Sequence, residues 1–143
     1  MSFLLDTNVI SEWVKPQPDL NVVAWLAEVD EDRAFLSVAS LAEIRHGIEL
    51  LPAGRRRHRL EAWLEEDLPA RFEGRILDID SRVAARWGVF MSRGKKAGRP
   101  LGTMDAFFAA TAEVHGLTLV TCNTRDFEAL EVTLLDPSSR TES

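Results

Sequence analysis

Short apolar runs alternate along this sequence with longer segments in which apolar residues recur every three or four positions. This alternation predicts strands that are separated by helices. The clearest helix is expected over residues 40–51, because its apolar side chains fall on one face. A Pro-Ala-Gly break at residues 52–54 ends this helix, and a further helix after it would complete a helical hairpin.

The pattern along the whole chain defines the predicted fold class. Strands are expected at residues 3–6, 34–37, 75–79, 117–121 and 132–135. Helices are expected at residues 9–14, 20–29, 40–51, 56–67, 82–92 and 104–114, with a basic, glycine-rich loop at 94–102. Strands separated by helices imply right-handed parallel crossovers. The predicted fold class is therefore α/β, a three-layer α/β/α sandwich with a mostly parallel central sheet.

The length of the chain, 143 residues, fits one domain with a sizeable core. No internal repeat or linker interrupts the pattern, so we expect a single domain over residues 1–137. Residues 138–143 are polar, and we expect them to form a frayed C-terminal tail.

An acidic residue follows several of the apolar runs. Phe3-Leu4-Leu5 runs directly into Asp6, and ligands of open α/β sheets bind at the carboxyl ends of the strands. The same layout recurs at three other acids, Glu43 after residues 35–38, Asp105 after residues 101–104, and Asp126 after residues 119–123. If the strands are parallel, the four carboxylates converge at one edge of the sheet.

Each of these acids also has a local explanation as part of a helix cap. The capping candidates are Asp6, Thr7 or Asn8 for the first helix, Ser40 with Glu43, Thr103 before Asp105, and Asn123 with Asp126. Taken together, however, clustered carboxylates repel one another unless a cation lies between them. Mg²⁺ and Mn²⁺ prefer oxygen ligands and suit phosphoryl transfer. The joint pattern therefore favours a metal-dependent phosphodiester chemistry.

Charge and cysteine content bear on the binding partners and on the cellular compartment of the protein. The net charge is −6, which argues against a simple cationic nucleic-acid binder. Positive charge gathers at residues 55–59 and 93–99, where phosphate contacts and solvated helix ends are both open interpretations. Within the second segment, Arg99 or Lys95 is a candidate for steering an RNA backbone. A single Cys122, with no long apolar run and no signal-peptide pattern, leads us to expect a cytoplasmic protein without a membrane span.

Four motifs in this order resemble a PIN domain. They are Leu4–Asn8, Ser40–Ile44, Thr103–Ala106 with Ala109–Ala112, and Leu119–Phe127. More narrowly, the chain is similar to the VapC-like toxic ribonucleases of type II toxin–antitoxin modules. The resemblance covers nearly the whole chain. One departure is Cys122, which stands where many relatives carry Arg, so a cation at that place is not expected.

The resemblance carries expectations about activity and partners. It implies Mg²⁺- or Mn²⁺-dependent RNA cleavage, with Asp6, Glu43, Asp105 and Asp126 as metal ligands and catalytic residues. It implies further polar side chains that line or brace the pocket, at Thr7, Asn8, Thr121 and Asn123. It also implies a homodimer and a small cognate antitoxin that occludes the active site. A metal-bound water would attack the scissile phosphate in line.

Other chemistries have weaker support. The three His residues are dispersed and show no zinc spacing. Asp80 fits an N-cap, and the tryptophans fit a core or a dimer interface better than a base-stacking platform. One rival is a non-catalytic PIN-like module that binds RNA or protein. Another is an aspartyl-phosphate enzyme with Asp6 as its nucleophile, but such phosphatases need a second Asp where this chain has Asn8.

Overall fold

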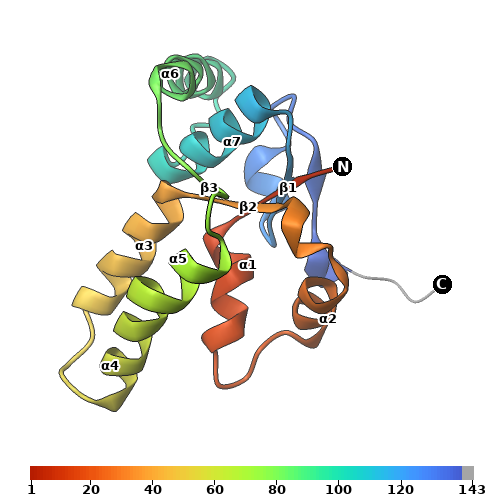
Figure 1. Cartoon of the computed structure of the whole chain (residues 1–143). Coiled ribbons are helices and arrows are strands. Elements are labelled where there is room, and N and C mark those ends of the chain that lie inside the picture. The colour runs from red at the N-terminus through yellow and green to blue at the C-terminus, as the bar shows by residue number, and fades with distance from the viewer. Residues whose placement is uncertain (140–143) are drawn as a thin grey trace.

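The computed structural model describes residues 1–139, which form a five-stranded sheet between two layers of helices (Figure 1). The strands are β1 (Phe3–Leu5), β2 (Ala34–Ser37), β3 (Ile76–Leu77), β4 (Thr118–Val120) and β5 (Leu134–Leu135). Their order across the sheet is β3-β2-β1-β4-β5, and every neighbouring pair is parallel. The predicted α/β class with a parallel central sheet is confirmed.

Each strand contributes to two separate cores. In β1, Leu5 packs into one core and Leu4 into the other, and in β4 Val120 and Leu119 divide in the same way. Successive side chains of a strand point to opposite faces, so a strand covered on both sides needs a continuous apolar run. This explains why the strands read as short, uninterrupted apolar segments in the sequence.

One layer of helices covers the first of these faces. It contains α1 (Thr7–Ile10), the 3₁₀ turn η1 (Ser11–Val14), α2 (Leu20–Glu28), η2 (Glu31–Arg33), α3 (Val38–Glu49), α4 (Arg55–Ala62), a π-helical segment η3 (Trp63–Asp67) and α5 (Leu68–Arg71). Ile48 and Phe72 are among the side chains that fill the core beneath it. The helical hairpin expected around residues 52–54 is present as α3 and α4 (Figure 1).

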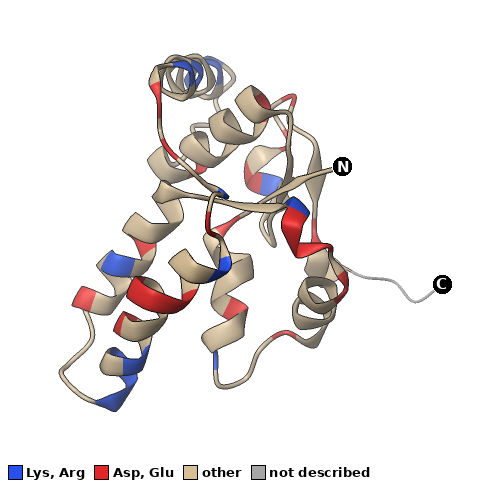
Figure 2. Ribbon diagram, viewed as in Figure 1, with Lys and Arg blue, Asp and Glu red and all other residues tan. Residues whose placement is uncertain are grey.

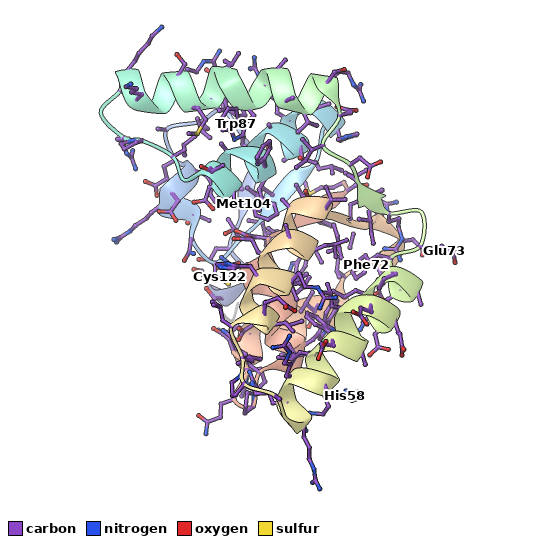
Figure 3. The ribbon with its side chains drawn as sticks, turned by 90° about the vertical axis from the view of Figure 1, so that its left-hand side faces the viewer. His58, Phe72, Glu73, Trp87, Met104 and Cys122 are labelled. Carbon is purple, nitrogen blue, oxygen red and sulfur yellow. The ribbon has the colours of Figure 1, made fainter. Side chains whose placement is uncertain are left out.

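The opposite face is covered by α6 (Ser81–Lys96), α7 (Thr103–His115) and the 3₁₀ turn η4 (Thr124–Phe127). Phe90, Phe108 and Phe127 are fully buried there. Trp87 of α6 stacks on Phe107 of α7 with ring centroids 5.3 Å apart, and it lies where the two helices meet (Figure 3). A last 3₁₀ turn, η5, spans Pro137–Ser139.

Two predicted boundaries are wrong for local reasons. The helix expected from residue 40 begins at Val38, because the Ser37 side chain accepts a hydrogen bond from the backbone N–H of Ala39 at 3.0 Å. The loop expected from residue 94 begins later, because α6 continues to Lys96 through a glycine. The end of α7 is as predicted, with Gly116 in the left-handed conformation at φ +65°.

The order of the strands marks where a ligand site belongs. From β1 the chain proceeds to β2 and β3 on one side of the sheet, and it later places β4 and β5 on the other side. Such a reversal opens a crevice at the carboxyl ends of the two central strands. Asp6 follows β1 directly, and Thr121 follows β4 directly.

Residues 138–143, for which a frayed tail was predicted, fall into two groups. Ser138 and Ser139 belong to η5 and bond to the Asp136 side chain. Residues 140–143 lie outside the described part of the chain. Within residues 1–139, no helix has the length and apolar character that crossing a membrane requires.

Candidate active site

Asp6 lies at the centre of the candidate site. It is only 5% exposed, and its backbone N–H continues the β1–β4 pairing by donating to the Val120 carbonyl at 2.9 Å. Thr121 Oγ1 donates to Asp6 Oδ2 at 2.8 Å, and Asn8 Nδ2 approaches the same oxygen at 3.4 Å. Asp6 precedes α1 but makes no capping hydrogen bond to it. The carboxylate is therefore held by Thr121 at the neighbouring strand end and by Asn8 of α1, without a side-chain cap of that helix.

A small polar network fixes this arrangement. The backbone N–H of Cys122 donates to Asn8 Oδ1 at 3.2 Å, which orients the Asn8 amide because a backbone N–H can only donate. The Asn8 amino group then faces Thr121 Oγ1 at 3.3 Å. Asn123 joins through its backbone N–H, which donates to Thr121 Oγ1 at 3.1 Å. These bonds tie the segment after β1 to the segment after β4.

Glu43 reaches the site from α3. Thr7 Oγ1 lies 2.6 Å from Glu43 Oε1 and 2.9 Å from Ser40 Oγ. A carboxylate only accepts, so the Thr7 hydroxyl proton points to Glu43 and the Ser40 hydroxyl is left to donate to Thr7. Ser40 is fully buried, and it lies one helical turn before Glu43 on the same face. This chain of hydroxyls fixes the position of the Glu43 carboxylate.

Asp105 and Asp126 approach from the other helical layer. Asp105 is in the first turn of α7, and Asp126 is exposed in η4. Both line a cleft of about 330 Å³. The other residues lining it are Arg99, Pro100, Leu101, Gly102, Arg125 and Ala129.

Electrostatics connects all four acids. Burial, together with the charges of Asp105 and Glu43 and against the opposing hydrogen bond from Thr121, raises the pKa of Asp6 to about 6. Burial also raises the pKa of Asp105, with contributions from Asp126 and Glu43. Each carboxylate therefore lies within the field of at least one other. The acid after β1 and those of α3, α7 and η4 form one negatively charged site.

The donor chemistry of this site fits a hard divalent cation. Carboxylate and hydroxyl oxygens are the groups that Mg²⁺ and Mn²⁺ prefer. Among residues 1–139, however, no three acidic, His or Cys side chains are gathered tightly enough to hold an ion directly. Mg²⁺ keeps several waters and uses one or two carboxylates, so this spacing is compatible with the cation.

Comparison with known proteins places the chain in a family. The PIN domain model matches residues 3–132. The chain belongs to the PIN-domain family. Over 134 residues it is 41% identical to Toxin FitB of Neisseria gonorrhoeae, covering 94% of this chain and 96% of that protein. It is 36% identical over the same length to the VapC ribonuclease Y4jK of Sinorhizobium fredii, also covering 94% and 96%. Within the family the chain thus groups with the VapC and FitB toxins of toxin–antitoxin systems.

Solved structures agree with this placement. The structure of FitAB bound to the IR36 DNA fragment has a TM-score of 0.91 and 38% identity, covering 98% of each chain. The DNA-bound VapBC of Salmonella typhimurium has a TM-score of 0.75 and 28% identity, covering 96% of this chain and 98% of that one. The fold of this PIN domain is therefore that of these toxins.

The capping explanations for the four acids are wrong in this PIN domain. Ser37 caps α3, so Ser40 and Glu43 lie inside that helix and form no capping box. Gly102, not Thr103, occupies the N-cap position of α7. Asn123 precedes η4 without a side-chain capping bond. None of the four acids is therefore explained by helix capping.

Asp80 and the tryptophans behave as predicted, and the structure also shows the surroundings of Cys122. Asp80 caps α6 by accepting from the Val83 N–H at 3.0 Å. Cys122 is half-buried against the core, and burial raises the pKa of its thiol to about 11, so the thiol is not a reactive thiolate. Trp63 packs on the core, as do the other three tryptophans. The structure gives Ser40, which the sequence suggested as a helix cap, the role of a brace for Thr7. It also adds Arg125, which the sequence reasoning did not single out, as a wall of the cleft.

Proposed function

We propose that this PIN domain is a Mg²⁺- or Mn²⁺-dependent endoribonuclease that acts as the toxin of a toxin–antitoxin pair. The observation that carries the proposal is the convergence of four carboxylates from separate elements, none of which serves as a helix cap. The VapC ribonuclease of Sinorhizobium fredii and the tRNA(fMet)-specific endonuclease VapC of Shigella flexneri, 29% identical over 128 residues, support ribonuclease chemistry.

We assign Asp6, Glu43, Asp105 and Asp126 as the metal-binding and catalytic residues, of which one or two would bind the cation directly and the others through its waters. Thr121 and Asn8 both bond to Asp6 Oδ2, and among residues 1–139 no side chain donates to Oδ1. When bound, the cation would lower the pKa of a water and offset the charge that develops on the scissile phosphate.

The remaining polar residues keep these carboxylates in place. Thr7 and Ser40 hold Glu43 so that it cannot rotate away from Asp6 and Asp105. Asn8 links the ends of β1 and β4, so the two central strand ends move as one unit. Rigid placement matters, because small displacements of catalytic groups reduce rates strongly.

An antitoxin and a second copy of the chain complete the proposal. A groove of about 310 Å³ runs from Thr7 and Glu43 between η1, α3 and α4. Apolar side chains dominate its lining, including Ile44, Leu60 and Trp63. The FitAB and VapBC structures are complexes, which supports an antitoxin as a partner. We assign the groove to a segment of that antitoxin because its lining is apolar and it borders Glu43. Co-expression with the neighbouring gene product and light scattering of the purified complex test both the antitoxin and the homodimer.

Cleavage of total cellular RNA tests the enzymatic part. The wild type should cut RNA with Mg²⁺ or Mn²⁺ and stop in EDTA. Asp6→Asn should abolish cutting, because it removes ligand charge at nearly constant volume. Asp32→Asn makes the same chemical change in η2, before β2 and therefore at the amino end of the sheet, and should cut like the wild type. Cleavage by Asp6→Asn at the wild-type rate would exclude the assignment, and absence of EDTA-sensitive cleavage would favour a non-catalytic binding module.

A further inference from the structure

Two arginines beside the acidic site form no ion pair, whereas six other arginines of the described chain do. The arginines paired with carboxylates are Arg33, Arg45, Arg57, Arg71, Arg82 and Arg86. Within residues 1–139, neither Arg99 nor Arg125 forms an ion pair, although Asp105 and Asp126 line the same cleft. Their positive charges are therefore available to an anion that enters the cleft.

The end of α6 determines where Arg99 lies. The Arg99 N–H donates to the Gly94 carbonyl at 2.9 Å, and the Gly98 N–H donates to the Lys95 carbonyl at 3.2 Å. Gly98 is left-handed at φ +71°, so these bonds form a Schellman motif. A Cβ atom on Gly94 would come within 2.8 Å of the Arg99 carbonyl oxygen. The glycines of this basic segment thus allow the chain to fold back tightly and bring Arg99 to the cleft.

A direct hydrogen bond connects the two arginines. An Arg99 guanidinium nitrogen donates to the Arg125 carbonyl at 3.2 Å, which anchors the loop after α6 to η4. Phe127, the last residue of η4, is fully buried and holds η4 on the core. A guanidinium has five N–H donors, so four of those on Arg99 remain for a ligand.

We propose that Arg99 and Arg125 form the phosphate-binding wall of the substrate cleft and hold an RNA phosphate next to the one that is cut. This inference rests on the proposed function. Asp105 and Asp126 would repel a polyanion, whereas guanidinium groups bind phosphate through paired hydrogen bonds. Lys95, the other cation considered from the sequence, does not line this cleft. The basic residues at the start of α4 lie at the far end of the molecule from α6 (Figure 2).

Binding of a short, mixed-sequence, single-stranded RNA tests the wall. Kd is measured by fluorescence anisotropy over a salt series in EDTA, because the proposed metal-dependent cleavage stops there and the RNA stays intact. Arg99→Gln and Arg125→Gln should each weaken binding about tenfold, which is the effect of losing a charged hydrogen bond. Each should also reduce the slope of log K against log salt by about 0.7, the value for one lost phosphate contact.

A matched control separates local contacts from net charge. Lys96→Gln removes the same charge from the same segment but lies outside the cleft, and it should change Kd by less than about twofold. Arg99→Lys should keep the salt slope while losing part of the affinity, because an ammonium cannot bind in bidentate fashion. Equal binding by Arg99→Gln, Arg125→Gln and Lys96→Gln would overturn the inference. Circular dichroism melts verify that each variant is folded.

Cleavage assays on the same proteins distinguish this inference from the proposed function. A wild type that cuts RNA while the arginine variants bind normally would overturn the phosphate wall alone. A wild type that binds RNA through the arginines but never cuts it would support the wall and overturn the proposed endoribonuclease.

Discussion

Asp6→Asn should stabilise the metal-free protein at neutral pH, since ionised Asp6 is buried beside other carboxylates. The pKa of Asp6 is raised from 3.8 to about 6 by burial and by Asp105 and Glu43. Between these two values the folded chain binds more protons at this site than the unfolded chain does. Stability contributed by Asp6 is therefore present at low pH and is lost as pH rises through about 6.

The size of the effect follows from the pKa difference. At about 1.4 kcal/mol per tenfold change, a rise from 3.8 to about 6 corresponds to about 3 kcal/mol. Asparagine keeps the volume and can still accept the Thr121 hydrogen bond, but it cannot ionise. The free energy of unfolding of Asp6→Asn, relative to the wild type, should therefore grow by about 3 kcal/mol between about pH 4 and pH 7.

Urea unfolding in EDTA at a series of pH values measures this difference. Asp32→Asn is the matched control, because its exposed carboxylate lies in η2, before β2, and its curve should run parallel to that of the wild type. A gap between Asp6→Asn and wild type that stays constant from acid to neutral pH would refute the reasoning. It would mean that Asp6 ionises without opposition from its surroundings.

Two further predictions concern the supports of the site. Ser40→Ala should remove the brace of Thr7 and loosen Glu43. Mn²⁺ binding should then weaken about tenfold, as it does when a residue that supports a metal ligand is lost. Unchanged Mn²⁺ affinity in titration calorimetry would contradict this role. Gly94→Ala should displace the Arg99 loop and destabilise the fold by about 1–3 kcal/mol, because the new Cβ would lie 2.8 Å from the Arg99 carbonyl oxygen. An unchanged urea midpoint would contradict this and show that the loop accommodates the methyl group.

The parallel sheet and the acidic residues could be predicted from the sequence because both depend on local pattern. A buried parallel strand needs an apolar run, and the residue after it is at the carboxyl edge whatever follows. Asp6 could therefore be recognised from five residues of sequence. The start of α3 could not, since Ser37 and Ser40 are both suitable N-caps and only packing selects Ser37.

The supporting contacts were beyond prediction for a different reason. Thr7 and Ser40 are 33 residues apart, and Asn8 and Thr121 are 113 residues apart. Such pairs meet only through the order of strands in the sheet, which a hydrophobic pattern does not specify. The four capping alternatives were equally consistent with the sequence, and only the observed cap bonds eliminate them.

The net charge of −6 counted against nucleic-acid binding, yet the charge that matters to a ligand is local. Charges separated by more than about 8 Å are largely screened at physiological salt. In the cleft, the nearby charges are two carboxylates that suit a cation and two guanidinium groups, Arg99 and Arg125, that have no carboxylate partner among residues 1–139. A phosphodiester needs both kinds of neighbour, a cation at the bond that breaks and fixed positive groups along the backbone. An acidic protein can therefore act on a polyanion when its unpaired arginines lie beside its carboxylates.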